Sequence, residues 1–173
     1  MRKLLMIGAS ALVLAACGST AAKSSATTTT TKKTTTPSAA PVAMTEAQAA
    51  KVYTAAIGPM NSALTALGKQ ANGWTNSTPT STVTAALAPV NSALTKGENE
   101  LNALAVKYPK AATALHNLTT AASSMDGVLN SVTSANVFSL SSWVTQLEQA
   151  ASVTNNDANI VRSELGLPPT SQD

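Results

Sequence analysis

Apolar and small residues recur in alternating steps of four and three along the chain from residue 53 to residue 165. Such steps bring side chains onto one face of an α-helix and form the heptad seams of helical bundles. The pattern divides into four segments, whose seams run through residues 53–74, 83–108, 111–132 and 140–165. No strand-like alternation competes with it. The chain therefore predicts four helices.

The residue types at the ends of these segments support the same division. Thr45 followed by Gln48 has the spacing of a capping box, which begins a helix. Pro109 suits the first turn of the third segment, and Gly166 with Pro168 just beyond it ends the fourth. The stretches NGWTNSTPTS and TSANVFS separate the remaining segments.

The connections between the predicted helices are short, which favours antiparallel neighbours. We therefore predict an all-α fold, an up-down-up-down antiparallel four-helix bundle over residues 44–167. A chain of about 130 residues can enclose a single adequate core. Residues 168–173 are predicted to form a C-terminal tail.

An internal repeat places a proline inside each of the first two predicted helices. The sequence TAAIGPMNSALT at residues 54–65 matches TAALAPVNSALT at residues 84–95 at nine of twelve positions. Pro59 and Pro89 each remove a backbone hydrogen bond, so each kinks its helix or breaks it. One interpretation is a tolerated kink inherited through duplication. The other is that the kinks splay the two helices and open a cavity.

The first 43 residues have a different pattern. A positive start at residues 1–3 is followed by a largely apolar run at residues 4–16, and the only cysteine of the chain, Cys17, comes next. This is the layout of a secretory signal peptide over residues 1–16, and the run is too short to span a bilayer. An ordinary cleaved signal would leave Cys17 as a free thiol.

The residues Leu14-Ala15-Ala16-Cys17 resemble the lipobox of bacterial lipoprotein precursors. The resemblance implies that the Cys17 thiol receives a diacylglycerol with acyl chains such as palmitate, and that Cys17 becomes the first mature residue. Two or more acyl chains hold a protein firmly at a membrane. The resemblance thus implies an extracytoplasmic protein, lipid-anchored to the bacterial cell membrane or envelope.

Residues 17–43 form a linker rich in serine, threonine, alanine and proline, without apolar periodicity. Such a segment buries too little surface to offset the entropy of ordering, so we predict a disordered tether. It resembles the threonine-rich tethers of actinobacterial lipoproteins, in which threonines can carry sugars. Glycosylation of this tether is left open.

The formal charge of +3 does not belong to the predicted bundle. From residue 44 onward the chain has six basic and eight acidic residues, a net charge of −2. A nucleic-acid-binding surface needs clustered lysine and arginine, so a nucleic-acid partner is disfavoured.

Side chains typical of catalysis or metal binding are sparse. A metal site in a bundle needs inward-facing glutamates with histidines, and the single His116 follows a seam residue by one, on the solvent side. Glu98 and Glu100 are interpreted as a solvated face. We therefore expect no catalytic residues, no metal and no cofactor, and a protein that is not an enzyme.

Three aromatic residues, Trp74, Phe138 and Trp143, are predicted at the end of the bundle far from the tether. In one interpretation they plug the end of an alanine-rich core. In the other they form an apolar contact site for a partner or ligand, since tryptophan supplies much of the binding energy at interfaces.

Two functions remain open at this stage. The first is a non-enzymatic interaction or envelope-structural module that meets an unknown envelope protein. The alternative is a carrier or sequestering protein for a small apolar ligand held between proline-kinked helices. A cavity lined by Met60, Val90 and Met125 would favour the carrier. A packed core with an exposed Trp74 or Trp143 would favour the module.

Overall fold

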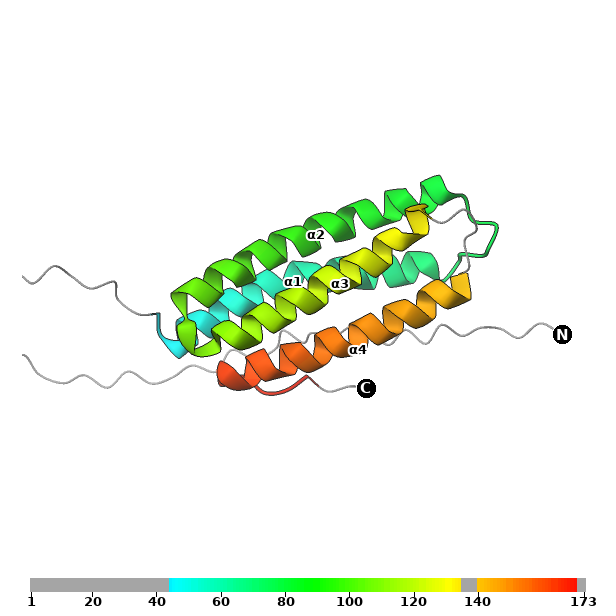
Figure 1. Cartoon of the computed structure of the whole chain (residues 1–173). Coiled ribbons are helices and arrows are strands. Elements are labelled where there is room, and N and C mark those ends of the chain that lie inside the picture. Colours follow the sequence, from blue (N-terminus) through cyan, green and yellow to red (C-terminus); the bar gives the residue numbers. More distant parts are fainter. Residues whose placement is uncertain (1–43, 135–139, 171–173) are drawn as a thin grey trace, which may run out of the picture.

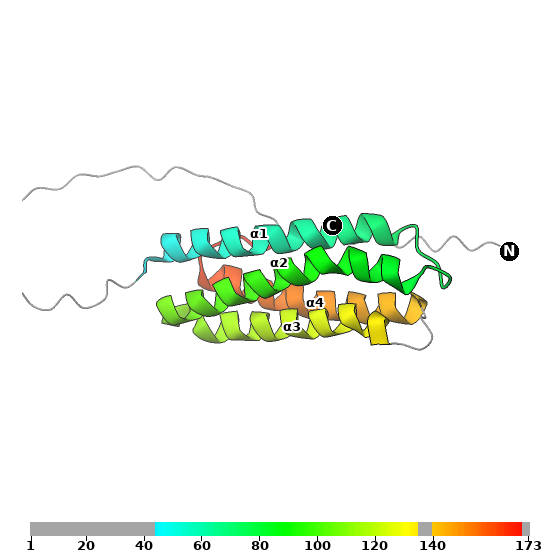
Figure 2. The same cartoon turned by 90° about the horizontal axis from the view of Figure 1, so that it is seen from above.

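The computed structural model describes residues 44–134 and 140–170, which form a bundle of helices (Figure 1). In chain order these are α1 (Glu46–Ala71), α2 (Thr80–Lys107), the short 3₁₀ helix η1 (Pro109–Ala111), α3 (Ala112–Ser134) and α4 (Leu140–Glu164). Successive α-helices run in opposite directions, as Figures 1 and 2 show. The described residues contain no strand. The predicted all-α four-helix bundle is confirmed.

The start of α1 is fixed by the predicted capping box. The backbone N–H of Gln48 donates to Thr45 Oγ1 at 3.3 Å, and the N–H of Thr45 donates to Gln48 Oε1 at 2.9 Å. These bonds satisfy backbone groups that have no partner within the helix. The start of α2 has no such side-chain bond, because its N-cap is Pro79.

The heptad seams predicted for the first three helices form the core. Every seam residue of α1, α2 and α3 is buried, including Leu87, Leu115 and Leu118 at 1% exposure or less. In α4 the prediction holds only for the second half, where Thr154, Ala158, Val161 and Leu165 are buried. The first four predicted seam residues of α4 are only partly buried: Leu140, Val144, Leu147 and Ala151.

Trp143, not a predicted seam residue, is the buried side chain in the first turn of α4. Its indole is large enough to reach the core from the flank of the helix. At this end the core-facing side of α4 therefore includes Trp143 beside the predicted residues Leu140, Val144 and Leu147, which pack partly buried against the core.

The backbones of α1 and α4 do not approach as closely as those of the other neighbouring helices. Large side chains bridge the wider space between them. At one end the hydroxyl of Tyr53 donates to the carbonyl of Ala158 at 3.4 Å. At the other end the rings of Trp74 and Trp143 lie 5.8 Å apart at an angle of 37°. The first and last helices are thus joined through side chains.

Both helices that contain an internal proline continue through it. Pro59 lies within α1 and Pro89 within α2, and both are exposed. Each proline removes the bond to the carbonyl four residues earlier, which belongs to Ala55 or Ala85. Ala55 and Ala85 are also exposed, so water can satisfy those carbonyls. Neither proline breaks its helix.

The chain turns back on itself after α4. Gly166 has a positive φ of 64°, and the N–H of Leu167 donates to the carbonyl of Arg162 at 2.8 Å. This is the Schellman arrangement, which glycine adopts without steric cost. The residues that follow run back along α4 (Figure 1).

None of the helices in the described residues combines the length and the apolarity that crossing a bilayer requires.

Candidate functional site

The residues singled out from the sequence fall into two groups. Cys17 and Phe138 lie outside the residues that the structure describes. Trp74, Trp143, Met60 and Met125 are described, and all four are buried. The expected contact residues therefore belong to the core of the bundle and not to its surface.

Trp74 and Trp143 are brought together at the end of the bundle opposite the start of α1. Their side chains are 9% and 4% exposed, and the Trp143 indole Nε1–H donates to the carbonyl of Val128 at 3.0 Å. A buried indole normally needs such a partner for its N–H. The pair fills the space between α1 and α4, and neither ring is exposed as a contact surface would require.

Met60, Val90 and Met125 are each only 1% exposed. Gly97 shows how closely this region is packed, because a Cβ added to it would clash with the Met60 side chain. Met60 therefore takes the space that a side chain on α2 would otherwise fill. The residues expected to line a cavity fill the core themselves.

Tyr53 and Arg162 form a buried polar group that the sequence analysis did not find. Tyr53 is fully buried, and burial raises its pKa to about 12, although the Arg162 charge and a hydrogen bond to Arg162 act in the opposite direction. Arg162 is 5% exposed, and its Nε–H donates to the carbonyl of Pro168 at 2.6 Å. Arg162 directly follows the seam residue Val161, as exposed His116 follows Leu115, so the heptad pattern carried no signal for its burial.

Polar side chains also join α2 to α3. Asn91 Nδ2 donates to Asn130 Oδ1 at 2.7 Å. Nearby, burial raises the pKa of Glu98, a hydrogen bond to Ser123 lowers it, and the charge of Asp126 raises it further. The described residues contain no group of three or more histidine, cysteine or acidic side chains placed to hold a metal ion.

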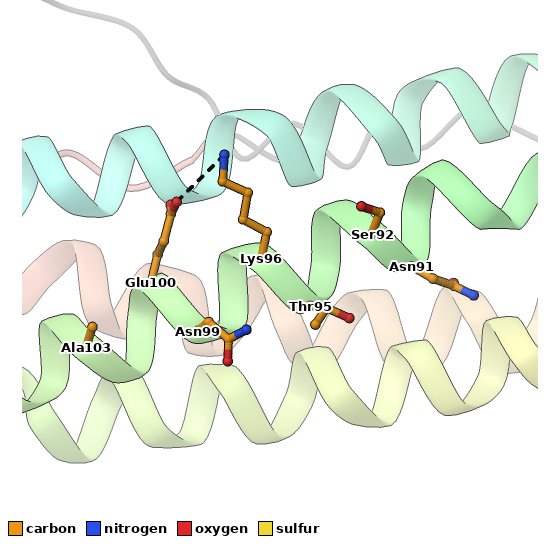
Figure 3. Close-up of a pocket in the computed structure, with 7 residues that line it drawn as sticks. All are labelled: Asn91, Ser92, Thr95, Lys96, Asn99, Glu100 and Ala103. Carbon is orange, nitrogen blue, oxygen red and sulfur yellow. Dashed lines mark ion pairs between the residues drawn. The ribbon is translucent and has the colours of Figure 1, made fainter.

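Two shallow hollows lie on the outside of the bundle, and both are open to solvent. The first, of about 620 Å³, lies on α2 and includes the ion pair of Lys96 and Glu100 at 3.9 Å (Figure 3). The second, of about 540 Å³, lies between α3 and α4 and includes Val153, which is 54% exposed. Exposed His116 lines neither hollow.

By fold this chain is an antiparallel four-helix bundle with short connections between its first three helices. Comparisons with models of protein families, with curated proteins and with solved structures gave no match for it. A fold of this kind hosts many unrelated functions, so function rests on the residues themselves.

Proposed function

We propose that this protein is a membrane-anchored, extracytoplasmic lipoprotein whose helical bundle is a non-enzymatic interaction or envelope-structural module. The lipobox-like Leu14-Ala15-Ala16-Cys17 supports the anchor, and the threonine-rich tether supports a bundle held away from the membrane surface. In this role the bundle presents side chains on its outer faces to a partner in the cell envelope.

The packing around Met60 is the observation that favours a module over a carrier. Met60 occupies the space above Gly97, and Val90 and Met125 are equally buried. A carrier would have to move these side chains before an apolar ligand could enter, and closely packed cores resist such changes. An interaction module makes no such demand on its core.

The anchor is tested by replacing the only cysteine. Cys17→Ser should move the full-length chain from the membrane fraction to the soluble fraction and remove the mass of the lipid, because no thiol remains to carry acyl chains. Ser19→Ala is the matched control and should stay in the membrane fraction. A Cys17→Ser chain that stays at the membrane would contradict the anchor.

The interaction role is tested by placing a photo-crosslinking amino acid at exposed apolar positions in the intact envelope. Ile160 on α4 is 51% exposed and Val106 on α2 is 80% exposed, so neither substitution disturbs the core. A discrete adduct from one position and not the other would support a defined contact face. No adduct from either position, with an apolar mass retained in native mass spectrometry and lost on unfolding, would favour the carrier instead.

A further inference from the structure

The last described residues, 165–170, which we call the tail, are held against α4 beside the start of α1. Gly166 lies next to the Glu46 side chain of α1, and Leu167 packs partly buried against the core. Thr170 is only 8% exposed although it lies six residues beyond the end of α4. The tail is thus docked on the bundle, where the sequence predicted only a C-terminal extension.

Two side chains of α4, Asn159 and Arg162, hold the tail, and we call them the tail site. Asn159 Oδ1 accepts from both the N–H and the hydroxyl of Thr170, each at 2.9 Å. Arg162 Nε donates to the Pro168 carbonyl at 2.6 Å. Two of these three bonds go to backbone atoms of the tail, and every polypeptide carries such atoms.

The sequence of the tail suits this mode of binding. Leu167 supplies an apolar anchor, and Pro168 and Pro169 favour an extended conformation with little conformational freedom left to lose on docking. Prolines lack an N–H, so they leave no unpaired backbone donor against the helix. The chemistry recognised is an apolar residue, two prolines and then a residue with a hydroxyl group.

The docked tail turns back at one residue, Gly166, and its side-chain hydrogen bonds come from Asn159 and Arg162. Arg162, which bonds the tail, is only 5% exposed, and keeping a cation out of water offsets part of the gain from its bonds. A segment from another chain that offers the same backbone groups and a larger apolar anchor can therefore compete with it.

We propose that the tail site binds an extended, proline-containing segment of another protein, with the apolar-Pro-Pro-hydroxyl chemistry of residues 167–170, and that the tail occupies this site until that segment arrives. This names the chemistry of the partner and rests on the proposed interaction function. The tail is an internal competitor, so its displacement should raise the affinity of the site.

The test uses the full-length protein in detergent and a fluorescent peptide with the sequence of residues 165–170. Gly166→Val should keep the tail from turning back, because a β-branched residue is strained at a φ of 64°. The matched control is Gly127→Val, at a helical position where an added Cβ meets nothing within 4 Å.

We expect Gly166→Val to bind the peptide about tenfold more tightly than the wild type or Gly127→Val. This factor corresponds to a tail that occupies the site in about nine molecules of ten. Adding Asn159→Ala should weaken that binding about fivefold by removing the acceptor for Thr170. If Gly166→Val has normal helix content but binds no more peptide than Gly127→Val, the proposal is wrong. The proposal is also wrong if adding Asn159→Ala does not change peptide binding. A crosslinked envelope partner at Ile160 or Val106 would then still support the interaction function.

Discussion

Gly97 and Met60 form a close fit between α2 and α1. The absence of a side chain at Gly97 lets the Met60 side chain lie against the α2 backbone, and the Ala56 carbonyl lies 3.4 Å from where a Cβ would stand. Sequence periodicity placed both residues on facing seams. It could not tell whether the small residue leaves a cavity or receives a larger side chain, because that depends on the distance between the helices.

Gly97→Ala should lower the free energy of unfolding by about 1–3 kcal/mol relative to Gly127→Ala, because Met60 must leave its place in a filled core. Gly127 is the matched control, since its added methyl group meets nothing within 4 Å and should stabilise α3 by about 0.5–1 kcal/mol. Urea denaturation of both variants measures the difference. Equal stabilities would show that the core has room around Met60.

Tyr53 gives the bundle a pH dependence in alkaline solution. Burial raises the Tyr53 pKa from 10.0 to about 12, so the folded state holds the phenolic proton more tightly than the unfolded state. The stabilisation is complete below pH 10 and is lost as pH rises toward 12. Between pH 10 and pH 12 the wild type should therefore lose about 3 kcal/mol of unfolding free energy through this group. Tyr53→Phe should not show that loss. Tyr108→Phe is the control and should show the same loss as the wild type. Urea denaturation at each pH gives the change of unfolding free energy with pH for both variants.

At the scale of elements, α1 and α2 show how a helix tolerates an internal proline. Pro59 and Pro89 both face solvent, and so do the alanines whose carbonyls lose a partner. Each proline comes directly before a buried seam residue, Met60 or Val90, and each is exposed. Whether they end their helices was not decided by the sequence, because the cost of one lost hydrogen bond competes with packing along the rest of the helix.

Pro89→Ala should raise the free energy of unfolding by about 1–3 kcal/mol, because it restores the bond to the Ala85 carbonyl without removing a buried contact. Pro79→Ala is the matched control. Pro79 is the N-cap of α2, where no intrahelical bond is lost, so the change should stay within about 0.5 kcal/mol. Thermal and urea denaturation give both values. A destabilised Pro89→Ala would mean that the helix shape imposed by the proline is needed for packing.

The seam of α4 is the element that the pattern described least well. Its second half follows the predicted heptad, but its first half exposes part of each predicted residue and buries Trp143 instead. The difference follows from size, since one indole on the flank reaches farther than the leucine and valine on the seam. A heptad pattern treats all apolar residues alike, so it does not reflect this difference in side-chain size.

For the whole molecule, the wide spacing of α1 and α4 is the feature that only side chains explain. Tyr53 with Ala158 closes one end, and Trp74 with Trp143 closes the other. Trp74 and Trp143 are 69 residues apart in the sequence, and Tyr53 and Ala158 are 105 residues apart. The bundle is therefore closed by contacts of long range along the chain.

Trp143→Ala should lower the free energy of unfolding by about 3–5 kcal/mol, because it removes a buried indole between the first and last helices. Val153→Ala in the same helix is the control. Val153 is 54% exposed, so its loss should change stability by less than about 0.5 kcal/mol. Tryptophan fluorescence during urea denaturation reports both variants, from Trp74 alone in Trp143→Ala and from both indoles in Val153→Ala. A small loss in Trp143→Ala would mean that the far end contributes little to holding the bundle together.

The sequence by itself determined the number of helices, most of their ends, the antiparallel topology and the three core seams of α1, α2 and α3, because helical periodicity, capping and short connections are local along the chain. It also supplied the lipobox-like residues at Cys17. The tertiary structure alone decided that Met60 fills the space at Gly97, that both tryptophans are buried, and that Arg162 and Asn159 hold the tail. Each of these depends on how far apart two helices, or a helix and a returning segment, come to rest, and that distance is set by all the side chains packed between them.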